Sequence, residues 1–141
     1  MSIFKLIYIN IDNIDIVVYI CRMKKYLTLK NLGWLITAVV VFMLGMGGFS
    51  KITQSEEMVA NMTFFNLLPQ MGWIGALEIV AIGLLSFPKT SIFGALGVST
   101  MMAGAVSLHF SYLGGAGIFM PILLGVLAWS AHCLRTYSVK A

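Results

Sequence analysis

The spacing of charged residues constrains this chain more than any other feature. No Asp, Glu, Lys or Arg occurs between Thr90 and Leu134, a stretch of 45 residues. Residues 31–50 are also uncharged, and residues 58–88 contain one charged residue, Glu78. A membrane-spanning helix needs about 20 apolar residues, because it rises about 1.5 Å per residue across a hydrocarbon core about 30 Å thick. The pattern therefore predicts several membrane-spanning helices.

The composition agrees with a membrane protein. Hydrophobic residues make up 60% of the 141 residues and charged residues 10%, whereas soluble domains contain about 25% charged residues. These values exclude a disordered chain, a coiled coil and a disulfide scaffold. The basic residues flank the apolar stretches, so we expect a lipid bilayer as the surroundings and no nucleic acid as a partner.

A glycine cluster divides the longest uncharged stretch into two spans. Gly114, Gly115 and Gly117 disfavour a helix interior and favour a tight turn. The stretches are apolar on all sides and do not alternate as the strands of a membrane barrel do. We therefore predict an all-α, four-helix transmembrane bundle. Its predicted spans cover about residues 32–50, 69–87, 91–112 and 118–135.

The basic residues predict that both termini are cytoplasmic, an N-in/C-in orientation. Lys51 alone falls near the opposite ends of the spans, and an excess of seven to one follows the positive-inside rule. The seven residues on the cytoplasmic side are Arg22, Lys24, Lys25, Lys30, Lys89, Arg135 and Lys140. We expect a multi-pass membrane protein with residues 51–68 facing outward, which in a bacterial cell means the inner (plasma) membrane.

The first 22 residues differ from the rest of the chain. Residues 1–22 are rich in isoleucine and valine, but Lys5, Asp12 and Asp15 interrupt the apolar run, so it is too charged to span a membrane. We interpret this segment as an N-terminal extension that arises from a start-site artefact. The alternative is a short strand or interfacial segment. Residues 23–141 then form one four-helix domain.

The longest predicted connection is residues 51–68. Its apolar residues recur near helical spacing, with acidic and amide side chains between them. This spacing fits a short amphipathic helix at the outer surface. A plain loop is the alternative.

Glu78 is the first candidate for a functional residue. It lies about nine residues into its span, which places it roughly 14 Å below the outer end, near the bilayer centre. A carboxylate there costs at least about 2.5 kcal/mol, so a cation, a proton or a water-filled cavity must offset that cost. The alternative is a protonated side chain whose hydrogen bond only fixes helix packing.

Lys51 and His109 fall in the same outer half of the predicted bundle. Lys51 is either an interfacial lysine that extends to water or a partner for Glu78 or an anionic ligand. Its stem reaches about 6 Å along a helix, so a direct bridge needs Glu78 to lie shallower than estimated. His109 is either a packing residue or a site residue, and histidine suits proton exchange near neutral pH. All three are candidates for ligand binding or proton exchange, and their shared outer half allows one common polar pocket without showing that they meet.

A second candidate site lies at the predicted inner end. Arg135 is interpreted mainly as an anchor at the lipid headgroups, and His132 as a residue that points inward. The chain contains no C-x-x-C or H-E-x-x-H motif and no glycine-rich phosphate loop, so no metal site and no catalytic residue is predicted.

Several short motifs resemble the DoxX-like family of small four-helix membrane proteins. They are Gly48-Phe49-Ser50-Lys51-Ile52, Leu68-Pro69 with Ile74-Gly75-Ala76-Leu77-Glu78-Ile79, Ala103-Gly104-Ala105 with His109, and Arg135. The resemblance covers about residues 30–137. It implies a four-helix bundle in the bacterial inner membrane, and it marks Lys51, Glu78, His109 and Arg135 as the residues to consider. Relatives are linked to membrane redox and oxidative-stress complexes.

We therefore expect an accessory or ligand-binding component of a quinone-linked membrane redox system rather than an enzyme. A quinone is the candidate cofactor, and a membrane oxidoreductase subunit or a second copy of the chain is the candidate partner. The alternative is a small proton-coupled transporter or exporter that works as an oligomer. In a third hypothesis the protein is structural and Glu78 only joins helices.

Overall fold

The computed structural model describes residues 29–137, so the interpretation of residues 1–22 lies outside the described part. Four helices are long and apolar enough to cross a membrane. They are Leu29–Ile52, Leu68–Ser86, Ser91–Leu113 and Phe119–Thr136. Their ends lie within about three residues of the predicted spans, and the all-α four-helix fold is confirmed. The N-in/C-in orientation stays a prediction.

Two short elements connect the first two spans. After the helix Leu29–Ile52 come α2 (Glu56–Phe64) and the 3-10 turn η1 (Leu68–Gln70). Residues 51–68 thus contain a helix rather than a plain loop. Pro69 stands within the first residues of η1, where its missing N–H costs nothing. No residue of α2 is buried, which fits a segment at the membrane surface.

The other three helices are α3 (Met71–Ser86), α4 (Ser91–Leu113) and α5 (Phe119–Tyr137). The glycine turn between α4 and α5 needs glycine, since Gly114, Gly115 and Gly117 have φ values of 58°, 92° and 79°. Residues with a Cβ rarely adopt this left-handed region. The described residues contain no strand.

The outside of the bundle is apolar. Phe42, Trp73 and Phe119 are 68%, 76% and 70% exposed, and a soluble monomer rarely shows so much contiguous apolar surface. Their exposure fits contact with lipid chains. The buried core is formed by small and medium residues, among them Val40, Leu85 and Ala128.

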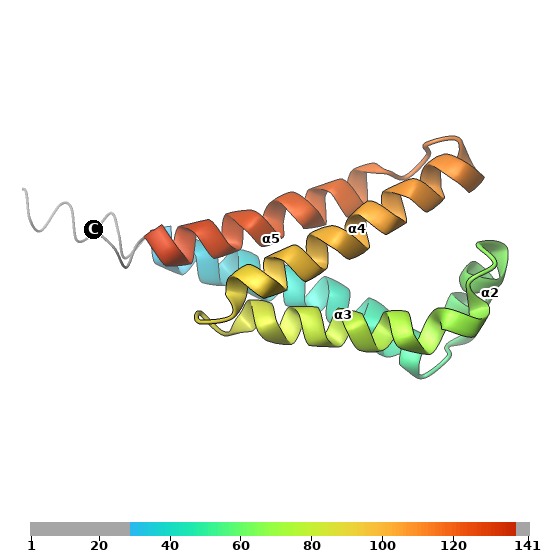
Figure 1. Ribbon diagram of the computed structural model, residues 1–141, viewed down its shortest axis with the longest axis horizontal. Helices are drawn as coiled ribbons and strands as arrows, with labels where there is room; N and C mark the ends of the chain where they lie inside the picture. Colours follow the sequence, from blue (N-terminus) through green and yellow to red (C-terminus); the bar gives the residue numbers. More distant parts are fainter. Residues whose placement is uncertain (1–28, 138–141) are drawn as a thin grey trace, which may run out of the picture.

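The helices converge at one end of the bundle and diverge at the other. Figure 1 shows α3 and α4 close together at the end where α5 finishes, and well apart at the end that carries α2. The space beside the glycines on one face of α4 increases along the helix in agreement with this divergence. A Cβ on Gly94 would overlap the backbone of Leu85, and one on Gly97 would lie 3.2 Å from the Ala81 Cβ, but one on Gly104 would meet nothing within 4 Å. We call the two ends the Arg135 end and the α2 end.

The first helix crosses from one partner to another along its length. At the Arg135 end, a Cβ on Gly33 would lie 2.9 Å from Arg135 Cγ of α5. At the α2 end, a Cβ on Gly75 of α3 would lie 2.7 Å from the carbonyl oxygen of Gly48. Small residues at such crossings let helix backbones approach closely in a membrane. This second crossing positions the candidate site.

Candidate functional site

An ion pair joins the first helix to α3. Lys51 Nζ lies 2.9 Å from Glu78 Oε1 and 2.7 Å from Oε2, so the ammonium donates to both carboxylate oxygens. The two side chains are only 11% and 7% exposed. Among the described residues, this is the only salt bridge. The pair therefore supplies the cation that a carboxylate within a membrane span requires.

The direct bridge corrects the expected depth of Glu78. The estimate measured each residue from the end of its own helix and placed Glu78 too deep for Lys51 to reach. A Cβ on Gly75 would lie 2.9 Å from Lys51 Cβ, so Lys51 stands level with Gly75, one turn from Glu78. One turn is about 5.4 Å, which the lysine stem covers. At the α2 end, α3 extends about one turn beyond the end of the first helix. The sequence did not show this offset between the two helix ends.

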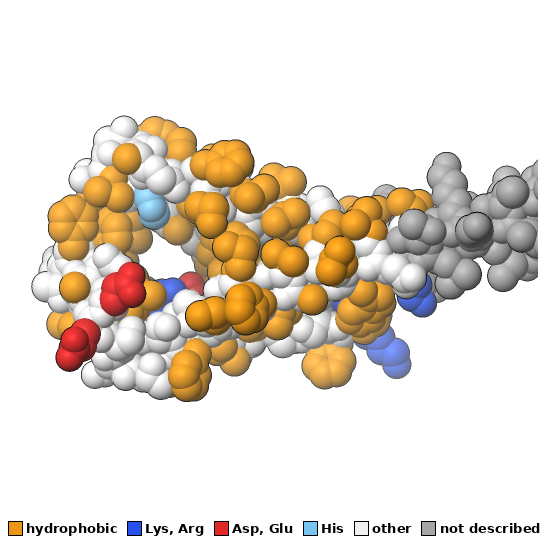
Figure 2. Space-filling model, turned by 180° about the vertical axis from the view of Figure 1, so that it is seen from behind, with side chains coloured by type: hydrophobic (Ala, Val, Ile, Leu, Met, Phe, Trp, Pro, Cys, Tyr) orange, Lys and Arg blue, Asp and Glu red, His pale blue; other side chains and the backbone are white. Residues whose placement is uncertain are grey.

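The ion pair lines a cavity of about 500 Å³ at the α2 end. Lys51, Glu78 and His109 all border this cavity, so the structure brings the three candidates together, while their role in ligand binding or proton exchange stays a prediction. Most other lining side chains are apolar, and they come from α2, its following loop, α3 and α4. They include Met62, Phe65, Ile74, Leu77, Met101, Met102 and Leu108. Figure 2 shows the hollow, with basic and acidic atoms along one edge and histidine atoms at the opposite edge.

His109 borders the cavity but does not bind the ion pair directly. Its Nδ1 lies 2.8 Å from the carbonyl oxygen of Ala105 on its own helix. Because a carbonyl oxygen only accepts, Nδ1 carries the hydrogen. Nε2 is then the acceptor of the neutral ring, and it becomes a second donor when the ring takes up a proton.

An aromatic cluster bridges the α2 segment to α4 at the same end. The Phe65 ring lies 6.0 Å from the His109 ring and 5.6 Å from the Tyr112 ring, between centroids. Phe64 packs 6.0 Å from Tyr112. Edge and tilted aromatic pairs at these distances are attractive. We call these four residues the aromatic cluster, and two of them, Phe65 and His109, also line the cavity.

Arg135 has a different role from the headgroup anchor that the sequence indicated. Its side chain is buried, with the residue 4% exposed. Nη2 donates to Leu85 O at 2.6 Å and Nη1 to Ser86 O at 3.4 Å. These carbonyls belong to the last turn of α3, where helix carbonyls have no partner within the helix. Arg135 therefore caps α3, and its guanidinium also lies 4.8 Å from the centre of the Trp34 ring.

His132 packs beside Arg135 in the same structural end. Its Nδ1 lies 2.7 Å from Ser91 Oγ at the start of α4, and its ring contacts Trp129 edge to face. Ser91 is only 1% exposed, so a substrate has no access to its hydroxyl in this structure. The inner-end candidates thus hold helix ends together.

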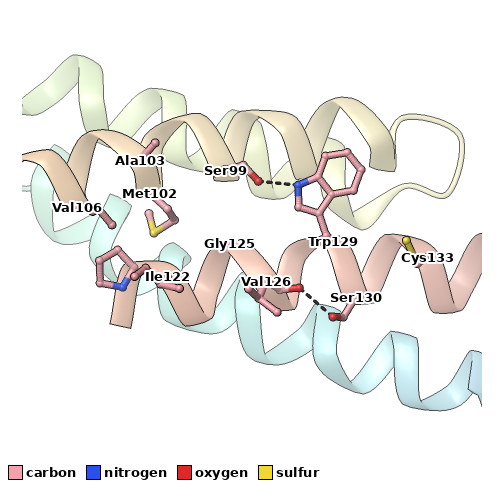
Figure 3. A pocket seen from close by; sticks show the side chains of 11 residues that line it. Ser99, Met102, Ala103, Val106, Ile122, Gly125, Val126, Trp129, Ser130 and Cys133 are labelled. Atoms are coloured by element: carbon pink, nitrogen blue, oxygen red, sulfur yellow. Dashed lines mark hydrogen bonds between the residues drawn. The ribbon is translucent and has the colours of Figure 1, made fainter. Parts of the chain in front are cut away.

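A second cavity of about 530 Å³ runs along α4 and α5. Figure 3 shows that its serine and tryptophan side chains have partners within the protein. Trp129 Nε1 donates to Ser99 Oγ at 2.8 Å, and Ser130 Oγ donates to the carbonyl oxygen of Val126 at 2.9 Å. This apolar groove lacks a charged residue, whereas the α2-end cavity has three titratable side chains. The α2-end cavity is therefore the better candidate site.

The described residues contain no group of three His, Cys, Asp or Glu side chains arranged for a metal ion. The fold and the cavity together define a multi-pass membrane protein, a four-helix bundle with an ion pair inside one end. The DoxX-like family matches residues 35–131. This is more than half of the chain, and the chain belongs to the DoxX-like family. Comparisons with curated proteins and with solved structures gave no match.

Proposed function

We propose that this DoxX-like protein binds a quinone in the α2-end cavity, as an accessory component of a membrane redox system. One observation carries the proposal: Lys51 and Glu78 are paired to each other on the wall of an otherwise apolar cavity. The cavity volume of about 500 Å³ falls within the usual range of ligand sites, about 300–1,000 Å³. Such sites combine apolar walls with a few polar groups that orient the ligand.

The ion pair suits both redox forms of a quinone. The Lys51 ammonium has three N–H groups, and two bonds to Glu78 leave one for a quinone carbonyl. The Glu78 carboxylate accepts hydrogen bonds, so it can hold the hydroxyl group of a quinol. His109 also lines the cavity, and Nε2 of its neutral ring can accept a hydrogen bond. Electrons would come from a partner oxidoreductase subunit.

Binding of decylubiquinone by the purified protein in lipid nanodiscs tests this proposal. Glu78→Gln keeps the size of the side chain but removes the negative charge. We expect its Kd to rise about tenfold or more, or about 1.4 kcal/mol. Ser99→Ala changes a polar group in the α4–α5 groove and should leave the Kd unchanged. Equal affinity of the wild type and Glu78→Gln, or no binding by the wild type, would contradict the proposal.

The double variant Lys51→Met/Glu78→Leu separates binding from a purely structural role, because it removes both charges and leaves neither one unpaired. If the pair only joins helices, replacing both partners by apolar residues should leave the quinone affinity unchanged. A lower quinone affinity in a double variant that keeps most of the wild-type stability would exclude that hypothesis.

The transporter alternative needs a different experiment. All lining residues of the α2-end cavity lie in that half of the bundle, and transport requires a path past the Arg135 end. Uptake into proteoliposomes, with and without a proton gradient, distinguishes the two functions. We expect no gradient-dependent uptake.

A further inference from the structure

The open side of the α2-end cavity faces sideways. The four long helices run along the longest axis of the molecule in Figure 1. The hollow in Figure 2 is seen perpendicular to that axis. When the helices span a bilayer, this opening faces the lipid chains rather than the water.

Residues of α3 and α4 leave this side open. Leu77 and Gly104 both line the cavity, yet Leu77 is 58% exposed and Gly104 is also exposed. A Cβ on Gly104 would meet no atom within 4 Å. The divergence of the two helices thus creates a lateral opening whose width depends on the absence of a side chain at position 104.

At the α2 end of the cavity, one aromatic ring connects the α2 segment to α4. Phe65 lines the cavity and packs on both His109 and Tyr112. Its ring extends from the α2 segment to α4, across the space between the diverging helices.

We propose that Gly104 and Phe65 together make the cavity selective for molecules dissolved in the membrane: Gly104 keeps the lateral opening wide, and Phe65 excludes water-soluble molecules. This inference rests on the proposed function in treating the cavity as a ligand site. It deepens that function by naming the ligand class, a lipophilic molecule that approaches through the bilayer between α3 and α4.

Photolabelling in vesicles tests the inference with two probes that carry the same diazirine group. One is a long-chain alkyl diazirine that dissolves in the bilayer, and the other is a sulfonated, water-soluble diazirine. Mass spectrometry then measures labelling of the cavity-lining peptides. In the wild type we expect labelling by the alkyl probe and little by the sulfonated probe.

Two variants change the probes' access in opposite ways. Gly104→Leu should lower labelling by the alkyl probe about fivefold, or about 1 kcal/mol in effective affinity. Gly83→Leu is the matched control, since a Cβ there also meets nothing within 4 Å and Gly83 does not line the cavity. Phe65→Ala should make the sulfonated probe label the cavity. Circular dichroism of each variant checks that the helices are intact.

Three results would overturn the inference. They are no labelling of the wild-type cavity by the alkyl probe, equal labelling by the sulfonated probe, and unchanged labelling in Gly104→Leu. Because neither probe is a quinone, the outcome is independent of quinone binding. If the labelling pattern holds while decylubiquinone fails to bind, the proposed function is wrong but the lateral access is supported.

Discussion

Each end of the bundle buries a basic side chain, but the two are held in different ways. At the Arg135 end, the guanidinium donates to backbone carbonyls of Leu85, Ser86 and Ala131. At the α2 end, Lys51 donates only to the carboxylate of Glu78. Backbone carbonyls at a helix end cannot leave without unwinding the helix, whereas a side-chain carboxylate can change partner. The comparison assigns Arg135 to the fold and Lys51 to the site.

Helix packing is also tighter at the Arg135 end than at the α2 end. On α4, Gly94 lies near the Arg135 end and Gly104 lies past the middle of the helix, and only at Gly94 would a Cβ overlap a neighbour's backbone. Gly104 faces open space. The same residue type therefore permits close packing at one end and keeps a cavity open at the other.

Removal of one partner of the ion pair should have the largest effect. Lys51→Met leaves the Glu78 carboxylate unpaired within the membrane, and we expect a loss of about 3–5 kcal/mol in the free energy of unfolding. The double variant Lys51→Met/Glu78→Leu should regain most of that stability, because apolar replacements of buried pairs are often neutral. Denaturation in mixed micelles measures both. If the double variant is as unstable as Lys51→Met alone, the ion pair itself stabilises the fold and is not retained only for the site.

Arg135→Leu should destabilise the protein by about 3 kcal/mol, because two or more carbonyls lose their donor at about 1–3 kcal/mol each. In contrast to the ion pair, no second substitution at a side-chain partner should rescue it. Arg135→Lys keeps the charge but loses the planar fork, so we expect an intermediate stability. Thermal unfolding followed by circular dichroism measures these differences. If Arg135→Leu is as stable as the wild type, Arg135 does not cap α3, and the interpretation as a headgroup anchor is supported instead.

Gly94→Ala should cost about 1–3 kcal/mol, since the added methyl group forces α3 and α4 apart where they touch. The measurement is again thermal unfolding. A neutral effect would mean that the helices are less closely packed at the Arg135 end than this structure has them.

Gly104→Ala should have the smallest effect and the opposite sign. The methyl group meets no neighbour, and alanine favours a helix interior over glycine by about 0.5–1 kcal/mol. We therefore expect a slightly raised unfolding temperature. A clear destabilisation would show that α3 lies close to Gly104 and that the cavity is narrower than described.

Much of the architecture could be predicted from the sequence. The uncharged stretches gave the four spans, because a bilayer requires long apolar helices. The single acidic residue within a span drew attention to Glu78, and the shared outer half grouped it with Lys51 and His109. These inferences need only the position of each residue along its own helix.

Relations between helices were harder to predict. The ion pair depends on how far the first helix and α3 are offset at the Gly48–Gly75 crossing, and nothing local reports that offset. Arg135 was misread because a headgroup anchor and a cap on a neighbouring helix both lie near the end of a span. Phe65 and Gly104 were not singled out as site residues. The motif around Ala103 contained Gly104, but only the divergence of α3 and α4 shows its role.

The contact between Lys51 and Glu78 inside a bilayer is the central claim of this account. Solid-state NMR on protein in vesicles, with 15N at lysine Nζ and 13C at glutamate Cδ, measures the distance between these atoms. The N–O distances of 2.7 and 2.9 Å predict a measurable 15N–13C dipolar coupling that disappears in Glu78→Gln. A wild-type spectrum without that coupling would contradict the ion pair and, with it, the proposed site.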